Sequence, residues 1–173
     1  MSHEWTCSVC GALHEGSPLS WGFDEPHYWT GSELQKSTGS CDEDVCWFDE
    51  DDGNRVQFVR GTIELPILDR ESSDEESFVI GAWASLSETN FGWLLDHWTA
   101  GAAEQGAAWF GWLSNEVPVY PDTLNLKTNV HLRGRELRPL IELQHTDHPL
   151  ARDQHEGITL ARARELGERW LHL

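Results

Sequence analysis

FGWLSNEVPVYPDTLNLKTNVHL, residues 110 to 132, is the stretch that decides the fold class. We interpret it as two strands, residues 107–117 and 124–132, joined by a corner. Pro118 and Pro121 mark the corner, because proline lacks a backbone N–H and has a fixed φ. The apolar residues expected to enter a core on the two sides of the corner are Phe110, Trp112, Leu113, Leu124, Leu126 and Val130. This hairpin predicts an α+β domain and carries no chemistry of its own.

The segments around the hairpin predict further strands of the same sheet. Residues 44–48, 57–67 and 138–143 are short alternating or apolar stretches, and Gly61 in the second of them indicates a bulge. Residues 78–86 are apolar almost throughout, which is typical of a central strand covered on both faces. Ser87 then begins a helix whose apolar positions repeat at i, i+3, i+4 and i+7.

Two helix starts are predicted after the sheet. Asp147 as N-cap and Pro149 in the first turn predict a short helix that Gly157 ends, and Thr159 caps the last helix. The predicted fold class is therefore α+β: a single domain with a mainly antiparallel sheet of about five or six strands, packed by two or three helices. Its parts are an N-terminal CxxC knuckle in residues 1–16, the sheet with one inserted helix in 17–145, and C-terminal helices in 146–173.

The composition indicates a folded, acidic protein. Hydrophobic residues make up 39% of the 173 residues, and there are ten Trp. The net charge of −18 would repel DNA, RNA and anionic lipid, so we expect neither a nucleic acid nor a membrane as partner. No segment approaches the length of a membrane span, and MSHEWTCSVCG lacks the basic and apolar regions of a secretory signal. We therefore expect a cytoplasmic protein.

Several strings in the chain occur together in a known bacterial family. They are CSVCGALHEG, DVCWFD, FVRGTIELPI, GAWASLSETNF, FGWLSNEVPVYPDTLNLKT, RPLIEL and TDHPLARDQHEGIT. In this order they resemble the family called domain of unknown function 2199, from about Cys7 to the last helix. The resemblance implies a small stand-alone bacterial cytoplasmic protein, and it implies no activity, because none is established for the family. Cys41 departs from the family pattern, which makes it a weaker site candidate than Cys7, Cys10 and Cys46.

A metal site is predicted at the CxxC turn. Cys7 and Cys10 with Gly11 form a C-x-x-C-G string, a spacing that can direct both sulfurs at one Zn²⁺. Because a structural zinc site needs four ligands, we predict Cys7, Cys10 and Cys46 with His14 as the fourth. Two alternatives stay open. One is a redox pair, which usually begins a helix of a βαβ unit, and the other is a vestigial site with two buried thiols.

A second cluster lies around Asp147 and His148. Together they are candidates for an acid–base pair or for an anion site at a helix N-terminus, and the alternative is a simple helix cap. His148 is also a candidate metal ligand that would connect the C-terminal half to the CxxC turn. Arg60 lies in an apolar strand, where it would form a buried ion pair with Asp44 or Glu64, or else hold a substrate.

The sequence favours a non-enzymatic, zinc-stabilised acidic module that binds another protein, in an immunity-type or regulatory role. Its negative charge would then form a face for a basic partner, although solubility or a salty cytoplasm would explain the charge as well. The alternative function is a small hydrolase-like enzyme with a site around Asp147, His148 and Arg60. A pocket in which these three residues converge would favour the enzyme, whereas a flat acidic face with exposed Trp would favour the binding module.

Overall fold

The core of the fold is one large β-sheet. The computed structural model of the chain describes residues 4–71, 75–100, 108–134 and 137–173. Eight strands form this sheet, in the order β3-β7-β8-β9-β10-β6-β5-β4. They are β3 (Ser20–Gly22), β4 (Ser40–Cys41), β5 (Val45–Asp49), β6 (Arg55–Pro66), β7 (Ser77–Leu86), β8 (Ala108–Leu113), β9 (Lys127–His131) and β10 (Leu140–Leu143). A separate hairpin consists of β1 (Glu4–Thr6) and β2 (Leu13–Glu15).

Five of the strands close into a ring. β6 pairs with β7 along its length and also with β10, so the order β6-β7-β8-β9-β10 returns to β6. The pairing of β10 with β6 is parallel, and the other four pairings in the ring are antiparallel. Side chains that alternate toward the inside fill the ring, for example Ile63 opposite Ile80. The ring therefore encloses the main hydrophobic core.

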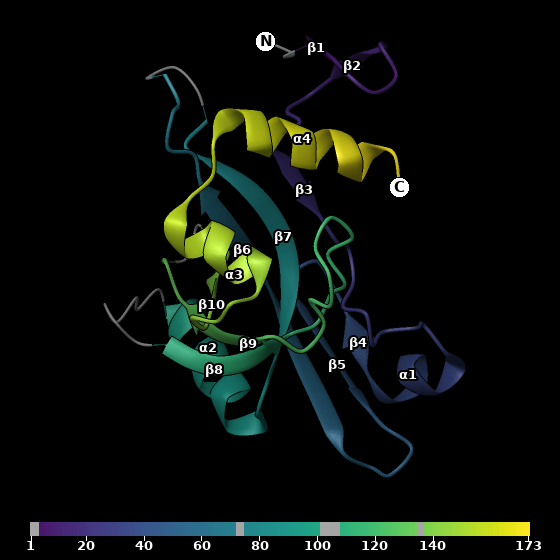
Figure 1. Cartoon of the computed structure of the whole chain (residues 1–173). Coiled ribbons are helices and arrows are strands. Elements are labelled where there is room, and N and C mark those ends of the chain that lie inside the picture. The colour runs from purple at the N-terminus through teal and green to yellow at the C-terminus, as the bar shows by residue number, and fades with distance from the viewer. Residues whose placement is uncertain (1–3, 72–74, 101–107, 135–136) are drawn as a thin grey trace.

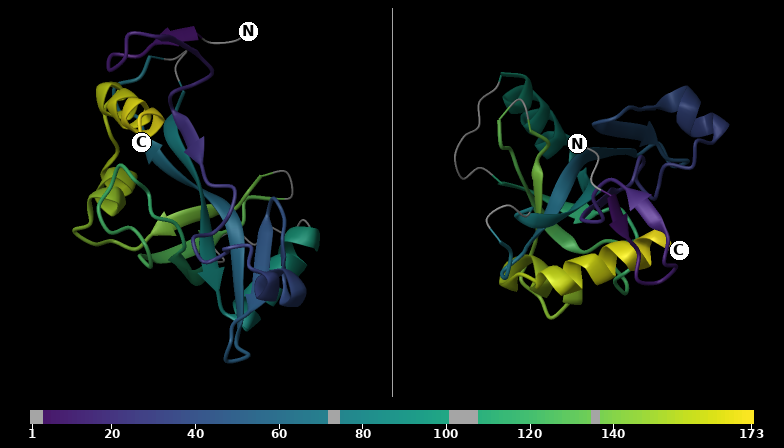
Figure 2. Two further views of the ribbon diagram at one scale, coloured as in Figure 1. Left: turned by 90° about the vertical axis from the view of Figure 1, so that its right-hand side faces the viewer. Right: turned by 90° about the horizontal axis from the view of Figure 1, so that it is seen from above.

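The later helices lie around this ring, whereas the first helix packs on β5 outside it (Figure 1). The helices are α1 (Glu33–Thr38), α2 (Glu88–Ala100), α3 (Pro149–Glu156) and α4 (Leu160–Leu171). In Figure 1, α4 crosses one end of the ring and α2 lies at the opposite end. Figures 1 and 2 both show the β1–β2 hairpin beside α4, so the first and last described segments of the chain meet there.

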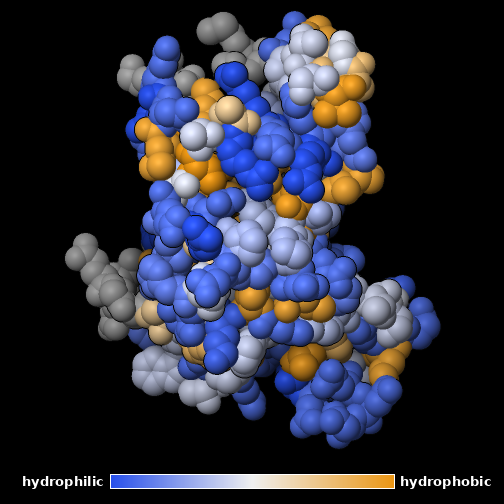
Figure 3. Space-filling model, viewed as in Figure 1, coloured by the Kyte–Doolittle hydropathy of each residue, from blue (hydrophilic) through white to orange (hydrophobic). Residues whose placement is uncertain are grey.

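The face seen in Figure 3 is mainly hydrophilic, and apolar residues appear on it only in small groups. Among the described residues, no helix is both long enough and apolar enough to cross a membrane.

The predicted α+β class with a mainly antiparallel sheet is confirmed. The predicted hairpin is present as β8 and β9, with Pro118 and Pro121 in its connection, whereas Ala107 lies outside the described residues. Within the described residues the sheet has eight strands rather than five or six, because β3 and β4 are too short to give an alternating pattern. The described part of region 17–145 contains two helices rather than one, since α1 forms a short helix capped by Ser32.

Gly61 does not form the expected bulge. It pairs regularly with Ala82 in the β6–β7 ladder. A Cβ atom at this position would lie 2.6 Å from the carbonyl oxygen of Pro139 and 2.8 Å from Ile141 Cγ1. Glycine is therefore needed where β10 approaches β6 and closes the ring.

Two aromatic residues of the hairpin lie outside the core. Leu113 and Val130 are buried as predicted, but Phe110 and Trp112 are each 40% exposed, so their assignment to the core was wrong. Side chains alternate along a strand, and the burial of Leu113 therefore turns Trp112 outward. The same outer face of the sheet is covered further along, where Phe58 and Trp83 form a second buried cluster.

Candidate metal centre

The β1–β2 hairpin brings the N-terminal cysteines and His14 together. Trp5 of β1 pairs with His14 of β2, and the turn between the strands carries both cysteines. The turn is closed by a hydrogen bond from the Gly11 amide to the Cys7 carbonyl oxygen, at 2.9 Å. Gly11 adopts a φ of 70°, a conformation that glycine reaches without strain. The local sequence therefore folds into the tight turn that the C-x-x-C-G string predicts.

The potential ligand atoms of Cys7, Cys10 and His14 lie within 4.8 Å of one another, and this group could hold a metal ion. Cys10 Sγ lies 3.4 Å from His14 Nε2. Cys7 is buried and Cys10 is exposed, so the group lies at the edge of the hairpin rather than in the core. Sequence reasoning identified all three of these residues.

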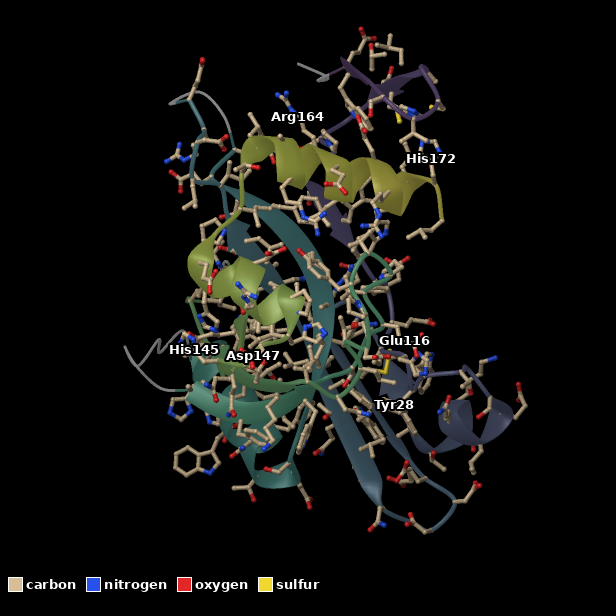
Figure 4. The ribbon with its side chains drawn as sticks, viewed as in Figure 1. Tyr28, Glu116, His145, Asp147, Arg164 and His172 are labelled. Atoms are coloured by element: carbon tan, nitrogen blue, oxygen red, sulfur yellow. A yellow bond between two sulfur atoms is a disulfide. The ribbon has the colours of Figure 1, made fainter. Side chains whose placement is uncertain are left out.

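The C-terminal helix adds a fourth side chain that sequence reasoning missed. His172 caps the C-terminus of α4, and its Nε2 lies 3.2 Å from Cys7 Sγ. Figure 4 shows His172 at the end of α4, next to the hairpin. No spacing signal connects residues 7 and 172, and a histidine at a helix C-terminus is common for reasons of charge alone.

The surroundings of Cys7 favour the thiolate form. Burial raises the pKa of the Cys7 thiol, but hydrogen bonds outweigh this and lower the pKa to about 7. These bonds come from the amide of Cys10, the ring of His172 and the amide of Val9, whose nitrogen lies 3.4 Å from the sulfur. Thiolate is the form of cysteine that binds metal ions.

Ser8, between the two cysteines, connects the turn to α4 by hydrogen bonds. Its amide donates a hydrogen bond of 3.0 Å to one carboxylate oxygen of Glu168, and its hydroxyl donates to the other. These bonds hold the pKa of Glu168 below its usual value. Glu168 and His172 are four residues apart, so one face of the last helical turn holds both contacts with the hairpin.

The structure corrects the assignment of Cys46 as a metal ligand. Cys46 lies opposite Cys41 in the β4–β5 pair, and the two form a disulfide. Cys46 is also buried beside Phe58 and Trp83 on the outer face of the sheet. It is thus part of a cross-strand pair and not of the group formed by the hairpin.

His148, and not Asp147, caps α3. His148 Nδ1 accepts a hydrogen bond from the amide of Leu150 at 3.1 Å, and Nε2 lies 2.6 Å from the carbonyl oxygen of Pro121. The prediction that Asp147 is the N-cap was wrong, because Pro149 begins the helix and the residue before it takes the cap position. Asp147 is exposed. We call Cys7, Cys10 and His14 the metal group. His148 is not part of it, and Figure 4 shows the adjacent Asp147 well away from His172.

Arg60 has a different partner from those predicted. Its guanidinium lies 3.7 Å from an oxygen of Asp24 and faces the ring of Trp83. Asp44 pairs instead with Arg138, and Glu64 pairs with Arg133. Among the described residues, no ion pair or side-chain hydrogen bond joins Arg60 to the cluster before α3.

The pocket next to the metal group does not contain the candidate catalytic residues. It has a volume of about 420 Å³ and lies between the hairpin and α4. Trp5, Arg164 and Glu168 are among the residues that line it, and none of the three candidate catalytic residues does. This pocket therefore does not bring Asp147, His148 and Arg60 together.

Comparison with known proteins identifies the family. The family model described as "Uncharacterized protein conserved in bacteria (DUF2199)" matches residues 6–158. The chain belongs to this family. No curated protein and no solved structure matches it. In this DUF2199 protein, Cys7, Cys10 and His14 lie within the matched residues, whereas His172 lies beyond them.

The DUF2199 protein also exposes aromatic side chains on β8. Phe110 and Trp112 contact each other edge to face with ring centroids 5.1 Å apart, and Lys127 Nζ lies 5.9 Å from the centroid of Trp112. We call Phe110, Trp112 and Lys127 the aromatic surface. Trp93 on α2 is 58% exposed, and Asn90 of the same helix donates a hydrogen bond to the carbonyl oxygen of Phe110.

Proposed function

We propose that this protein is a non-enzymatic, zinc-stabilised acidic module that binds another protein, in an immunity-type or regulatory role. The observation that carries the proposal is the aromatic surface. Two large aromatic side chains on one strand face are exposed, although the same outer face of the sheet is covered elsewhere. Aromatic residues are enriched in protein interfaces, where they supply much of the binding energy.

The charge of the chain supports a basic partner. The net charge of −18 would attract a positively charged protein and repel nucleic acid. The ring of Trp112 already faces the ammonium group of Lys127, and an arginine or lysine of a partner would bind the exposed part of the aromatic surface in the same way. We therefore propose a partner with an arginine- or lysine-rich surface.

Zinc would have a structural role in this module. Two sulfur donors and one imidazole form the soft ligand set that Zn²⁺ prefers. A hairpin with strands of only three residues has little core of its own, and a metal ion would stabilise it as it stabilises other small metal-binding units. The group lies on the hairpin and not on β8, so zinc would support the fold rather than contact the partner.

The test is capture of the partner by wild-type protein and by a double variant, Phe110→Ser with Trp112→Ser. A matched control is Leu34→Ser, which removes an exposed apolar residue from α1 instead. We expect crosslinking in a bacterial lysate to yield a basic protein that the double variant loses and the control retains. The affinity for the purified partner should fall as salt is raised. Equal capture by wild type and double variant, or an acidic partner, would contradict the proposal.

A further inference from the structure

The metal group on the hairpin lacks one ligand. Cys7, Cys10 and His14 supply three donors, and a structural zinc site has four, arranged as a tetrahedron. A site closed by the protein needs a further nitrogen, sulfur or oxygen atom at the remaining corner.

His172 contacts this group at Cys7. It is not among the residues whose ligand atoms all lie within 4.8 Å of one another, so its ring would move toward Cys10 and His14 to take the fourth corner. With Zn–S and Zn–N bonds of about 2.3 and 2.0 Å, sulfur and nitrogen ligands on two corners of a tetrahedron lie about 3.5 Å apart. The distance from Cys7 Sγ to His172 Nε2 is 3.2 Å, and the distance from Cys10 Sγ to His14 Nε2 is 3.4 Å. These two contacts, out of the six between four ligands, have nearly the separation that a shared zinc ion would impose.

Contacts made by neighbouring residues of α4 position His172 next to the hairpin. Glu168, one turn earlier in α4, accepts two hydrogen bonds from Ser8. Gly167 allows α4 to lie against the backbone of Pro18, because any Cβ atom there would collide with the Pro18 carbonyl oxygen. The helix and the hairpin are therefore already packed against each other before a metal ion binds. This reduces the entropic cost of adding a ligand from residue 172.

We propose that His172 is the fourth ligand of a zinc ion held by Cys7, Cys10 and His14. The resulting Cys₂His₂ site connects the N-terminal hairpin to the end of α4. This inference rests on the zinc site of the proposed function and adds a residue from outside the region that the family model matches. It also assigns α4 a second role, because the helix then completes the site as well as covering the sheet.

The experiment compares zinc affinity in the purified full chain and its variants, measured by competition with a chromophoric chelator. Wild type should bind about one zinc per chain. His172→Ala should bind zinc at least about tenfold more weakly, since even partners in the outer shell of a metal site contribute about that much. His172→Cys should retain the affinity within a few-fold, because thiolate is also a zinc ligand. Leu173→Ala is the matched control and should leave the affinity unchanged.

Cobalt substitution reports the ligands directly. Co²⁺ bound to wild type should show the intense visible bands of a tetrahedral site, and His172→Cys should gain thiolate-to-metal charge-transfer intensity. A structural role for His172 alone would not produce that gain. If His172→Ala binds zinc as tightly as wild type, or if the cysteine variant shows no added thiolate band, His172 is not a ligand. If wild type and Cys7→Ser both lack zinc, the zinc part of the proposed function fails as well.

Discussion

A tryptophan on the outer face of this sheet stabilises the fold only where neighbouring residues cover it. Trp83 is fully buried, whereas Trp112 is 40% exposed on a neighbouring strand. We expect Trp83→Ala to lower the free energy of unfolding by about 3–5 kcal/mol, the usual loss for a large buried aromatic residue. Trp112→Ala should cost about 1 kcal/mol or less. Urea denaturation of both variants checks this, and similar losses would mean that Trp112 belongs to the core.

The cap of α3 gives a second prediction about single residues. His148→Ala removes the acceptor for the Leu150 amide and should cost about 0.5–2 kcal/mol of unfolding free energy, the range for other helix caps. His148→Asn should restore most of it, because Asn is a good N-cap. Asp147→Ala is the control, since Asp147 is exposed and should change stability little. Thermal and urea unfolding would refute the assignment if Asp147→Ala were the more damaging change.

At the scale of residues, the sequence reveals sites only where the ligands lie close together in the chain. Cys7, Cys10 and His14 fall within eight positions, and one turn brings them together. His172 is 165 residues from Cys7 and arrives through the packing of α4, which leaves no spacing pattern. Cys46 was misassigned for a related reason. Its disulfide partner, Cys41, lies opposite it only because of the register in which β4 and β5 pair, and the sequence does not show that register.

At the scale of elements, a glycine in α4 tests how closely this helix approaches the N-terminal segment, and a glycine in α2 is the control. In Gly167→Ala the new methyl group would overlap the Pro18 carbonyl oxygen, so α4 must shift. Gly92→Ala in α2 places its methyl group in open space. Alanine favours a helix by up to about 1 kcal/mol over glycine.

We therefore expect Gly92→Ala to stabilise the protein by up to about 1 kcal/mol and Gly167→Ala to destabilise it despite the same gain in propensity. The two variants should be compared by chemical denaturation, and zinc affinity should fall in Gly167→Ala only. If both variants gained stability, the contact between α4 and Pro18 would be looser than the structure indicates.

The strands were predictable, but their closure into a ring was not. Alternation over residues 57–67 and the apolar run of 78–86 are local signals, and β6 and β7 followed from them. The pairing of Leu140 with Thr62 joins segments that are far apart in the chain. Gly61 was the sole local sign of that contact, and a bulge explained it equally well before β10 was placed.

At the scale of the whole molecule, the net charge of −18 predicts a protein that salt stabilises. Repulsion among the acidic residues opposes the compact state, and added ions screen it. The midpoint of thermal unfolding, followed by tryptophan fluorescence, should rise between about 0.01 M and about 1 M NaCl. A midpoint that fell with salt would show that local ion pairs outweigh the overall repulsion. A rise would agree with both explanations of the charge, a basic partner and a salty cytoplasm.

The ring of strands also implies an order of assembly. Four of its five strand pairings connect strands that follow one another in the chain, so these pairings can form early and locally. The fifth pairing brings β10 beside β6, two segments about 80 residues apart in the chain, and such non-local contacts are gained only after the chain has lost the entropy of closure. Folding should therefore begin as an open meander from β6 to β10 and finish when β10 and α3 pack against β6. The pairing of β10 with β6 should also be the first to separate when the native protein transiently opens.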